Sequence, residues 1–253
     1  YTRTKLFASK EEHEDGLLVD INWVNDVEFE NVRPYSASSE KKLESKINYY
    51  FDAPKYYFGT YFRYYLDTSL ESNKTTFQQL PQAQAHTFLQ PLIWDKILYS
   101  TDFKFTNKYR EEGSTANRYE LLVPISYSFY MFDDFLNVTL KEELTAIKQN
   151  YTNTTTKFDD ASFFENRHIL SLSTDLLKKY DSVLHTVNFE TIFTIPNTFG
   201  VDGDIYSINS TNSELSEFAI SETSKSLTFA LNQSIYDNED LEQIINHKIL
   251  LFE

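Results

Sequence analysis

The chain contains no cysteine, which excludes disulfides, thiolate metal sites and cysteine nucleophiles together. Glycine, tryptophan and methionine are also scarce, with 5, 2 and 1 residues among 253. No apolar stretch approaches the roughly 18 residues that a transmembrane helix requires. A P-loop, a G-x-G-x-x-G motif, a G-x-S-x-G elbow and an H-E-x-x-H zinc motif are absent as well. We therefore expect neither enzymatic activity nor a cofactor.

The chain has few positively charged residues: 23 Lys and Arg residues compared with 38 Asp and Glu residues, which gives a net charge of −15. An acidic chain repels the phosphate backbone of DNA and RNA, and no basic patch stands out in the sequence. We therefore expect no nucleic-acid partner.

What the sequence does contain is long-range alternation, together with 21 Phe and 18 Tyr residues. From Ile97 to Tyr109 every charged residue is even-numbered and every aromatic residue is odd-numbered. Successive side chains of a strand point to opposite faces, so this pattern predicts one long strand with an apolar and a charged face. The same alternation recurs over 119–131 and 183–195.

These runs are longer than ordinary strands, which have about 5–6 residues, and exceed the roughly 9–11 that cross a bilayer. They predict an all-β, antiparallel, up-and-down transmembrane β-barrel, with the odd-numbered residues of 97–109 and 119–131 facing lipid. The opposite faces supply candidates for the wall of a water-filled lumen: Asp102, Lys104, Asn188 and Glu190. A soluble β-sandwich would show the same alternation with inside and outside exchanged, so it remains the alternative fold.

About a dozen strands are expected, joined by connections that are alternately short and long, as in an up-and-down membrane barrel. The further strands are expected over 1–9, 17–32, 46–52, 56–67, 77–89, 137–150, 163–177, 224–236 and 241–253. Residues 40–47, 136–149 and 238–251 also fit helical spacing. For the last two we favour strands, because their neighbours require pairing partners.

The chain is expected to form a single domain over residues 1–253, as one segment of a larger barrel. The stretch 197–223 is rich in Ser, Asn, Asp and Glu and is predicted to be a long exposed loop. The N-terminus has neither an initiator Met nor an apolar signal region, so we interpret the chain as a piece of a longer protein.

Signals for metal-dependent or acid–base chemistry are weak. The five His residues are far apart in sequence and none has a ligand at motif spacing, so no metal site is expected. Paired carboxylates occur at Asp133-Asp134, Asp159-Asp160 and Asp202/Asp204. Asp is a favoured turn residue, so a structural role is preferred over a Ca²⁺ site or a glycosidase pair.

Several stretches resemble LptD, the lipopolysaccharide-assembly protein of the outer membrane, in its ε-proteobacterial form. The resemblance runs from about residue 15 to the C-terminus, as a diffuse similarity over barrel strands. Its carriers are Asp15-Gly-Leu-Leu-Val-Asp through Asn25-Asp-Val-Glu-Phe-Glu-Asn, Ser45-Lys-Ile-Asn-Tyr-Tyr, Tyr57-Phe-Gly-Thr-Tyr-Phe-Arg-Tyr-Tyr, Gln79-Leu-Pro-Gln, Leu170-Ser-Leu-Ser-Thr-Asp-Leu and His185-Thr-Val-Asn-Phe.

This resemblance implies part of a Gram-negative outer-membrane barrel of about 26 strands, preceded by a periplasmic jellyroll. The implied partners are lipopolysaccharide, an LptE-type plug lipoprotein in the lumen, outer-membrane lipid, and the periplasmic bridge proteins that reach the barrel through the jellyroll. Neither the jellyroll nor the lateral gate is expected within this chain. No family residue with an assigned role matches closely enough to be carried over.

Two functional alternatives remain, namely a soluble β-sandwich binding module and a passive porin or uptake barrel. The acidic balance also predicts repulsion of lipopolysaccharide phosphates unless divalent cations bridge them. We therefore expect no high-affinity lipopolysaccharide site in this segment.

Overall fold

In the computed structural model, residues 2–4, 13–22, 42–153, 158–205, 217–220 and 222–252 are described. They form one antiparallel sheet of 12 strands in which every strand pairs with the next one along the chain. The strands are β1 (Thr2–Thr4), β2 (Glu14–Asp20), β3 (Lys42–Ala53), β4 (Tyr56–Asp67), β5 (Gln78–Pro91), β6 (Ile97–Tyr109), β7 (Thr115–Met131), β8 (Leu136–Thr152), β9 (Ala161–Lys179), β10 (Val183–Asp202), β11 (Ser226–Asp237) and β12 (Gln243–Phe252). A short 3-10 helix, η1 (Asn73–Thr75), precedes β5. The all-β, antiparallel, up-and-down prediction is confirmed.

Strand pairing also decides between helix and strand where the sequence fits both. Leu136 to Thr152 forms β8, which pairs with β7 along its full length, and the stretch that includes Ile244 forms β12. Backbone pairing with neighbouring strands outweighs a local helical spacing in both stretches. The strand expected over 17–32 is described as β2 up to Asp20, and its part beyond Asn22 lies outside the described residues.

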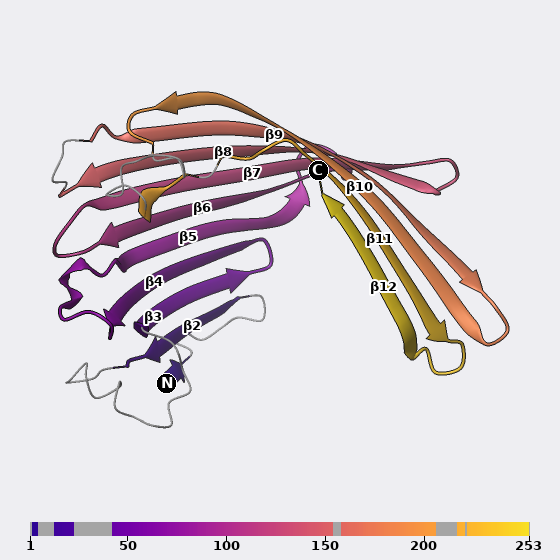
Figure 1. The fold of residues 1–253 in the computed structure, drawn as a ribbon, viewed down its shortest axis with the longest axis horizontal. Helices are drawn as coiled ribbons and strands as arrows, with labels where there is room; N and C mark the ends of the chain where they lie inside the picture. The colour runs from indigo at the N-terminus through magenta and orange to yellow at the C-terminus, as the bar shows by residue number, and fades with distance from the viewer. Residues whose placement is uncertain are drawn as a thin grey trace.

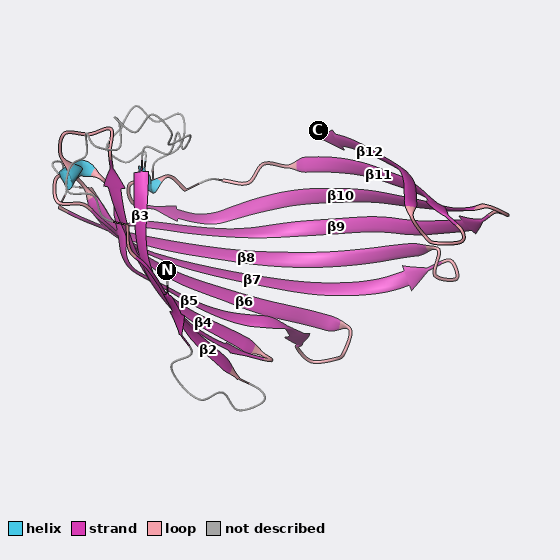
Figure 2. Ribbon diagram, turned by 90° about the horizontal axis from the view of Figure 1, so that it is seen from below, coloured by secondary structure: helices cyan, strands magenta, loops and turns pink. Residues whose placement is uncertain are grey.

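The sheet is a single curled layer. Figures 1 and 2 show it bending into an open trough, with β1 and β12 at its two edges. No second sheet packs against it in the described part of the chain, so a two-sheet sandwich is not the observed fold. No helix among these residues is long and apolar enough to cross a membrane.

The connections differ in length between the two ends of the sheet. One end carries the short turns 54–55, 92–96, 132–135, 180–182 and 238–242. At the opposite end the described connections are 68–77 and 110–114, while 21, 8 and 23 residues separate β2 from β3, β8 from β9 and β10 from β11. Short turns at one end and longer loops at the other are typical of up-and-down membrane barrels.

The long loop predicted over 197–223 requires correction at both ends. β10 continues to Asp202 and stops at Gly203, whose φ is +76° and where a Cβ would collide with the carbonyl oxygen of Asp160. Near the other end, Phe218 is 0% and Ile220 is 4% exposed. Burial of these two apolar side chains against the sheet is favourable, so this part is not an exposed loop. Residues 206–216 lie outside the described residues.

Candidate functional site

The cross-strand register divides the sheet into two faces. Phe103 lies opposite Leu121, which lies opposite Ala146, which lies opposite Phe164; the face that contains them is called the outer face. The opposite, concave face contains the corresponding row Thr106, Arg118, Gln149 and Ala161 and is called the inner face. The odd-numbered residues of β6 and β7 lie on the outer face, as their alternation indicated.

The outer face is apolar and uncovered by the described residues. Phe103, Leu121 and Phe164 are 41%, 40% and 41% exposed. β3, β4, β6 and β7 carry no Asp, Glu, Lys or Arg on this face. Soluble monomers rarely expose contiguous apolar surfaces of this kind, which mark contact with lipid or with other protein.

Aromatic pairs lie toward both ends of the outer face. Phe105 and Tyr119 contact each other with ring centroids 5.0 Å apart on the long-loop side. Tyr127 and Phe129 do so at 5.5 Å on the short-turn side. Two aromatic belts that flank an apolar band are characteristic of membrane barrels.

On β8 and β9 the outer face carries charged residues, namely Lys148, Lys178 and a pair formed by Glu142 and His168. His168 Nδ1 of β9 lies 2.8 Å from the Glu142 carboxylate of β8. The contact gives both the imidazole and the carboxylate a polar partner. This pairing lowers the cost of placing the two groups at an apolar surface.

The structure places all four lumen candidates on the inner face, where each has a polar neighbour. Gln84 Nε2 donates to Asp102 Oδ2 at 2.7 Å, and His86 Nδ1 lies 3.2 Å from the same oxygen. Lys104 Nζ lies 4.0 Å from Glu120 Oε2. That they line a lumen remains a prediction.

On β9 and β10, the inner face continues with the same polar character. Asn188 Nδ2 donates to Asp175 Oδ1 at 2.6 Å, and Ser171 Oγ donates to Glu190 Oε1 at 3.2 Å. Strand parity was therefore sufficient to place the charged candidates of β6 and the polar candidates of β10 on one face.

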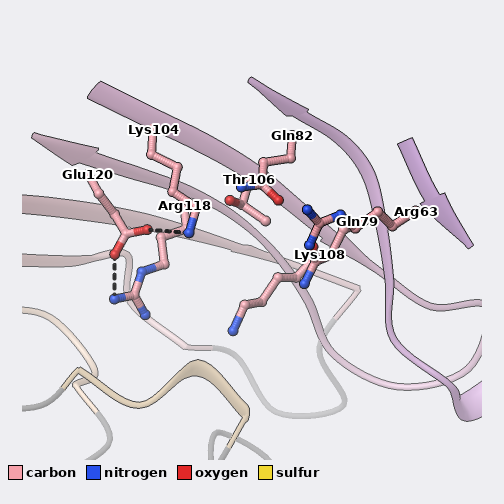
Figure 3. Close-up of a pocket in the computed structure, with 8 residues that line it drawn as sticks. All are labelled: Arg63, Gln79, Gln82, Lys104, Thr106, Lys108, Arg118 and Glu120. Carbon is pink, nitrogen blue, oxygen red and sulfur yellow. Dashed lines mark hydrogen bonds and ion pairs between the residues drawn. The ribbon is translucent and has the colours of Figure 1, made fainter. Parts of the chain in front are cut away.

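A cavity of about 340 Å³ is hollowed into the inner face near the long-loop end, and Figure 3 shows the side chains that line it. These are Arg63, Gln79, Gln82, Lys104, Thr106, Lys108, Arg118 and Glu120. Of these, only Lys104 was singled out from the sequence. A second residue of the lining, Arg63, could also have been predicted, because this charged residue alternates with Phe62 and Tyr64 in β4.

The segment 217–220 lies on the inner face beside this cavity, over β7 and β8 in Figure 1. Phe218 packs against Ala116 and meets the Phe77 ring edge-on, with centroids 5.3 Å apart. Ile220 packs against Ile147 and Phe163. These apolar contacts hold the segment on an otherwise polar wall.

A buried ion-pair network crosses β8 and β9 on the same face. Lys141 Nζ lies 2.6 Å from Glu143 Oε2, and Arg167 pairs with the other oxygen of Glu143. Arg167 Nε also lies 3.8 Å from Glu165 Oε1, which accepts a 2.9 Å hydrogen bond from Thr223 Oγ1. The side chains of Glu143 and Glu165 are only 8% and 3% exposed, so Arg167 compensates two buried carboxylates.

Replacing Arg167 with Met is expected to destabilise the protein by about 3–5 kcal/mol, because it removes the cation that pairs with buried Glu165 and one of the two cations that pair with buried Glu143. Denaturant titration of the folded protein in detergent micelles measures this loss. Lys55→Met, in the exposed turn between β3 and β4, is the control, with an expected change within about 0.5 kcal/mol. Equal stability of the two variants would contradict a structural role for the network.

The paired carboxylates noted in the sequence have structural roles in the connections between strands. Asp133 and Asp134 lie in the β7–β8 turn with φ of 54° and 66°, a conformation that Asp tolerates. Asp204 Oδ2 accepts from the backbone N–H of Asp159 at 2.7 Å, and Asp160 Oδ1 accepts from that of Tyr151 at 3.1 Å. Nowhere in the described ranges do three His, Asp or Glu side chains form a group that could hold a metal ion.

No protein-family model and no curated protein sequence matches this chain. Its function is therefore inferred from the chemistry of its two faces.

Proposed function

We propose that this chain is part of an outer-membrane β-barrel that translocates lipopolysaccharide and inserts it into the outer leaflet. The observation that carries the membrane part of the proposal is the exposed apolar outer face. β3 to β12 have between 10 and 20 residues each, enough to cross a bilayer when tilted. Lipid that covers this face would remove its apolar side chains from water.

The specific cargo is suggested by the resemblance to the lipopolysaccharide-assembly family and is compatible with the two faces. A polar inner wall suits the saccharide part of lipopolysaccharide, and an apolar exit between strands suits its acyl chains. Such transport makes and breaks no covalent bond, so no enzymatic activity is proposed. An LptE-type lipoprotein would lie against the inner face, and periplasmic bridge proteins would reach the barrel through a jellyroll.

The edges of the sheet bear on the size of the proposed barrel. Within the described residues, β1 and β12 each pair with a single neighbour. Unpaired backbone N–H and C=O groups are costly in lipid, so a barrel that contains this sheet requires pairing partners for the free edges of β1 and β12. We propose that further strands supply them. This requirement agrees with the larger barrel that the resemblance implies.

Depletion of the protein in the cells that make it tests the proposed cargo. We expect lipopolysaccharide to disappear from the cell surface and to accumulate on the periplasmic side, measured by surface labelling and fractionation. Uptake of small hydrophilic solutes is the parallel measurement. Intact surface lipopolysaccharide with a loss of solute uptake would overturn the proposal in favour of a passive porin.

A further inference from the structure

The cavity on the inner face concentrates positive charge in an acidic protein. Arg63 of β4, Lys104 and Lys108 of β6, and Arg118 of β7 line it together, and Glu120 is the one carboxylate in this lining. The lining therefore carries four positive charges and one negative charge, whereas the whole chain has a net charge of −15.

The carboxylates near the cavity do not balance these cations. Glu120 Oε1 accepts a 2.8 Å hydrogen bond from Arg118 Nη2, and its other oxygen lies 4.0 Å from Lys104 Nζ. Outside the lining, Glu44 forms an ion pair with Arg63 at 3.8 Å, and the charge of Glu217 acts on Lys108. Figure 3 shows Lys104 and Arg118 converging on this one carboxylate.

The same lining contains polar atoms without hydrogen-bond partners. Thr106 is 5% exposed, and its hydroxyl oxygen lacks a partner within the described structure. Three further buried atoms also lack a hydrogen-bond partner there: Arg63 Nε, Arg118 Nε and Gln79 Oε1. Buried polar groups in native proteins are almost always hydrogen-bonded, so a ligand or ordered water is required here.

Two of the cations are held in place by the neighbouring segment. Lys108 Nζ donates to the backbone oxygen of Glu217 at 2.6 Å, and Arg118 Nη1 donates to that of Ala219 at 3.1 Å. Backbone carbonyls orient these side chains without neutralising their charge. The cavity is therefore a preorganised electropositive site.

We propose that this cavity binds a phosphoryl group, as inorganic phosphate or as the phosphomonoester of a saccharide. A phosphoryl group carries a charge near −2 at neutral pH and offers three acceptor oxygens, which match guanidinium, ammonium and hydroxyl donors. The four cations of the lining still outnumber the three carboxylates that act on them, Glu120, Glu44 and Glu217. The proposal does not depend on which cargo crosses the membrane. It rests on a locally cationic lining within a chain whose net charge is acidic.

Calorimetric titration of the protein in a nonionic detergent at low salt tests the site, with inorganic phosphate, glucose 6-phosphate and glucose as probes. Saturable binding of either phosphorylated probe, with none of glucose, is expected. Binding of phosphate alone assigns free phosphate as the ligand, and binding of glucose 6-phosphate alone assigns a saccharide phosphate. The absence of binding by both phosphorylated probes would overturn the proposal.

Three variants distinguish a specific binding site from nonspecific electrostatic attraction. Lys104→Gln removes a cation whose nearest carboxylate is 4.0 Å away, and is expected to weaken binding about tenfold. Lys248→Gln removes an exposed lysine from the inner face of β12 and should change affinity less than twofold. Glu120→Gln removes the competing carboxylate and should tighten binding, which loss of structure cannot do. Equal weakening by the two lysine variants, or weaker binding by Glu120→Gln, would overturn the site.

Discussion

Replacing Phe103 with Arg is expected to impair membrane insertion severely. Phe103 is the central residue of β6, lies on the outer face and is 41% exposed. An arginine on the lipid face at the bilayer midplane costs about 2–4 kcal/mol. Folding into lipid vesicles, followed by circular dichroism and protease protection, measures the loss.

The matched control is Ser100→Arg on the inner face of the same strand, two residues from Asp102. An arginine there faces the polar wall and is expected to be tolerated. From strand parity alone Thr106→Arg would serve equally well. However, Thr106 is 5% exposed and lines the cationic cavity, where a fifth cation would be repelled. Equal damage from Phe103→Arg and Ser100→Arg would contradict the assignment of the outer face to lipid.

Replacing Phe218 with Ala is expected to release the segment 217–220 from the inner face. The Phe218 side chain is 0% exposed and packs against Ala116, Phe77 and Tyr151. Truncation of a fully buried Phe costs about 3–5 kcal/mol. Since each 1.4 kcal/mol is a factor of ten, proteolysis between β10 and β11 should accelerate by roughly 100-fold or more.

Phe135→Ala provides the comparison for this experiment. Phe135 lies in the β7–β8 turn and is 54% exposed, so its truncation should leave the cleavage rate almost unchanged. An unaltered cleavage rate in Phe218→Ala would show that polar contacts, such as Arg118 to the Ala219 carbonyl, hold the segment by themselves.

For most of the sheet, the sequence alone was enough to predict the strands and their two faces. Alternation is a local property, because residues two apart in a strand share a face whatever lies beside them. It predicted β6 with its observed bounds, from Ile97 to Tyr109, and placed Asp102 and Lys104 on the polar face. The prediction was wrong for 197–202 and 217–220, because burial and pairing depend on surfaces far away in the sequence.

Only the tertiary structure decided which residues meet across strands. Arg63, Lys104 and Arg118 come from three strands, and their convergence depends on the register of each hairpin and on the irregularity between Gln79 and Gln82. Likewise, no periodic pattern in the sequence predicts that Phe218 packs on the inner face. Register, curvature and loop docking arise from backbone pairing and apolar burial summed over the whole sheet. A local pattern of alternation therefore cannot specify them.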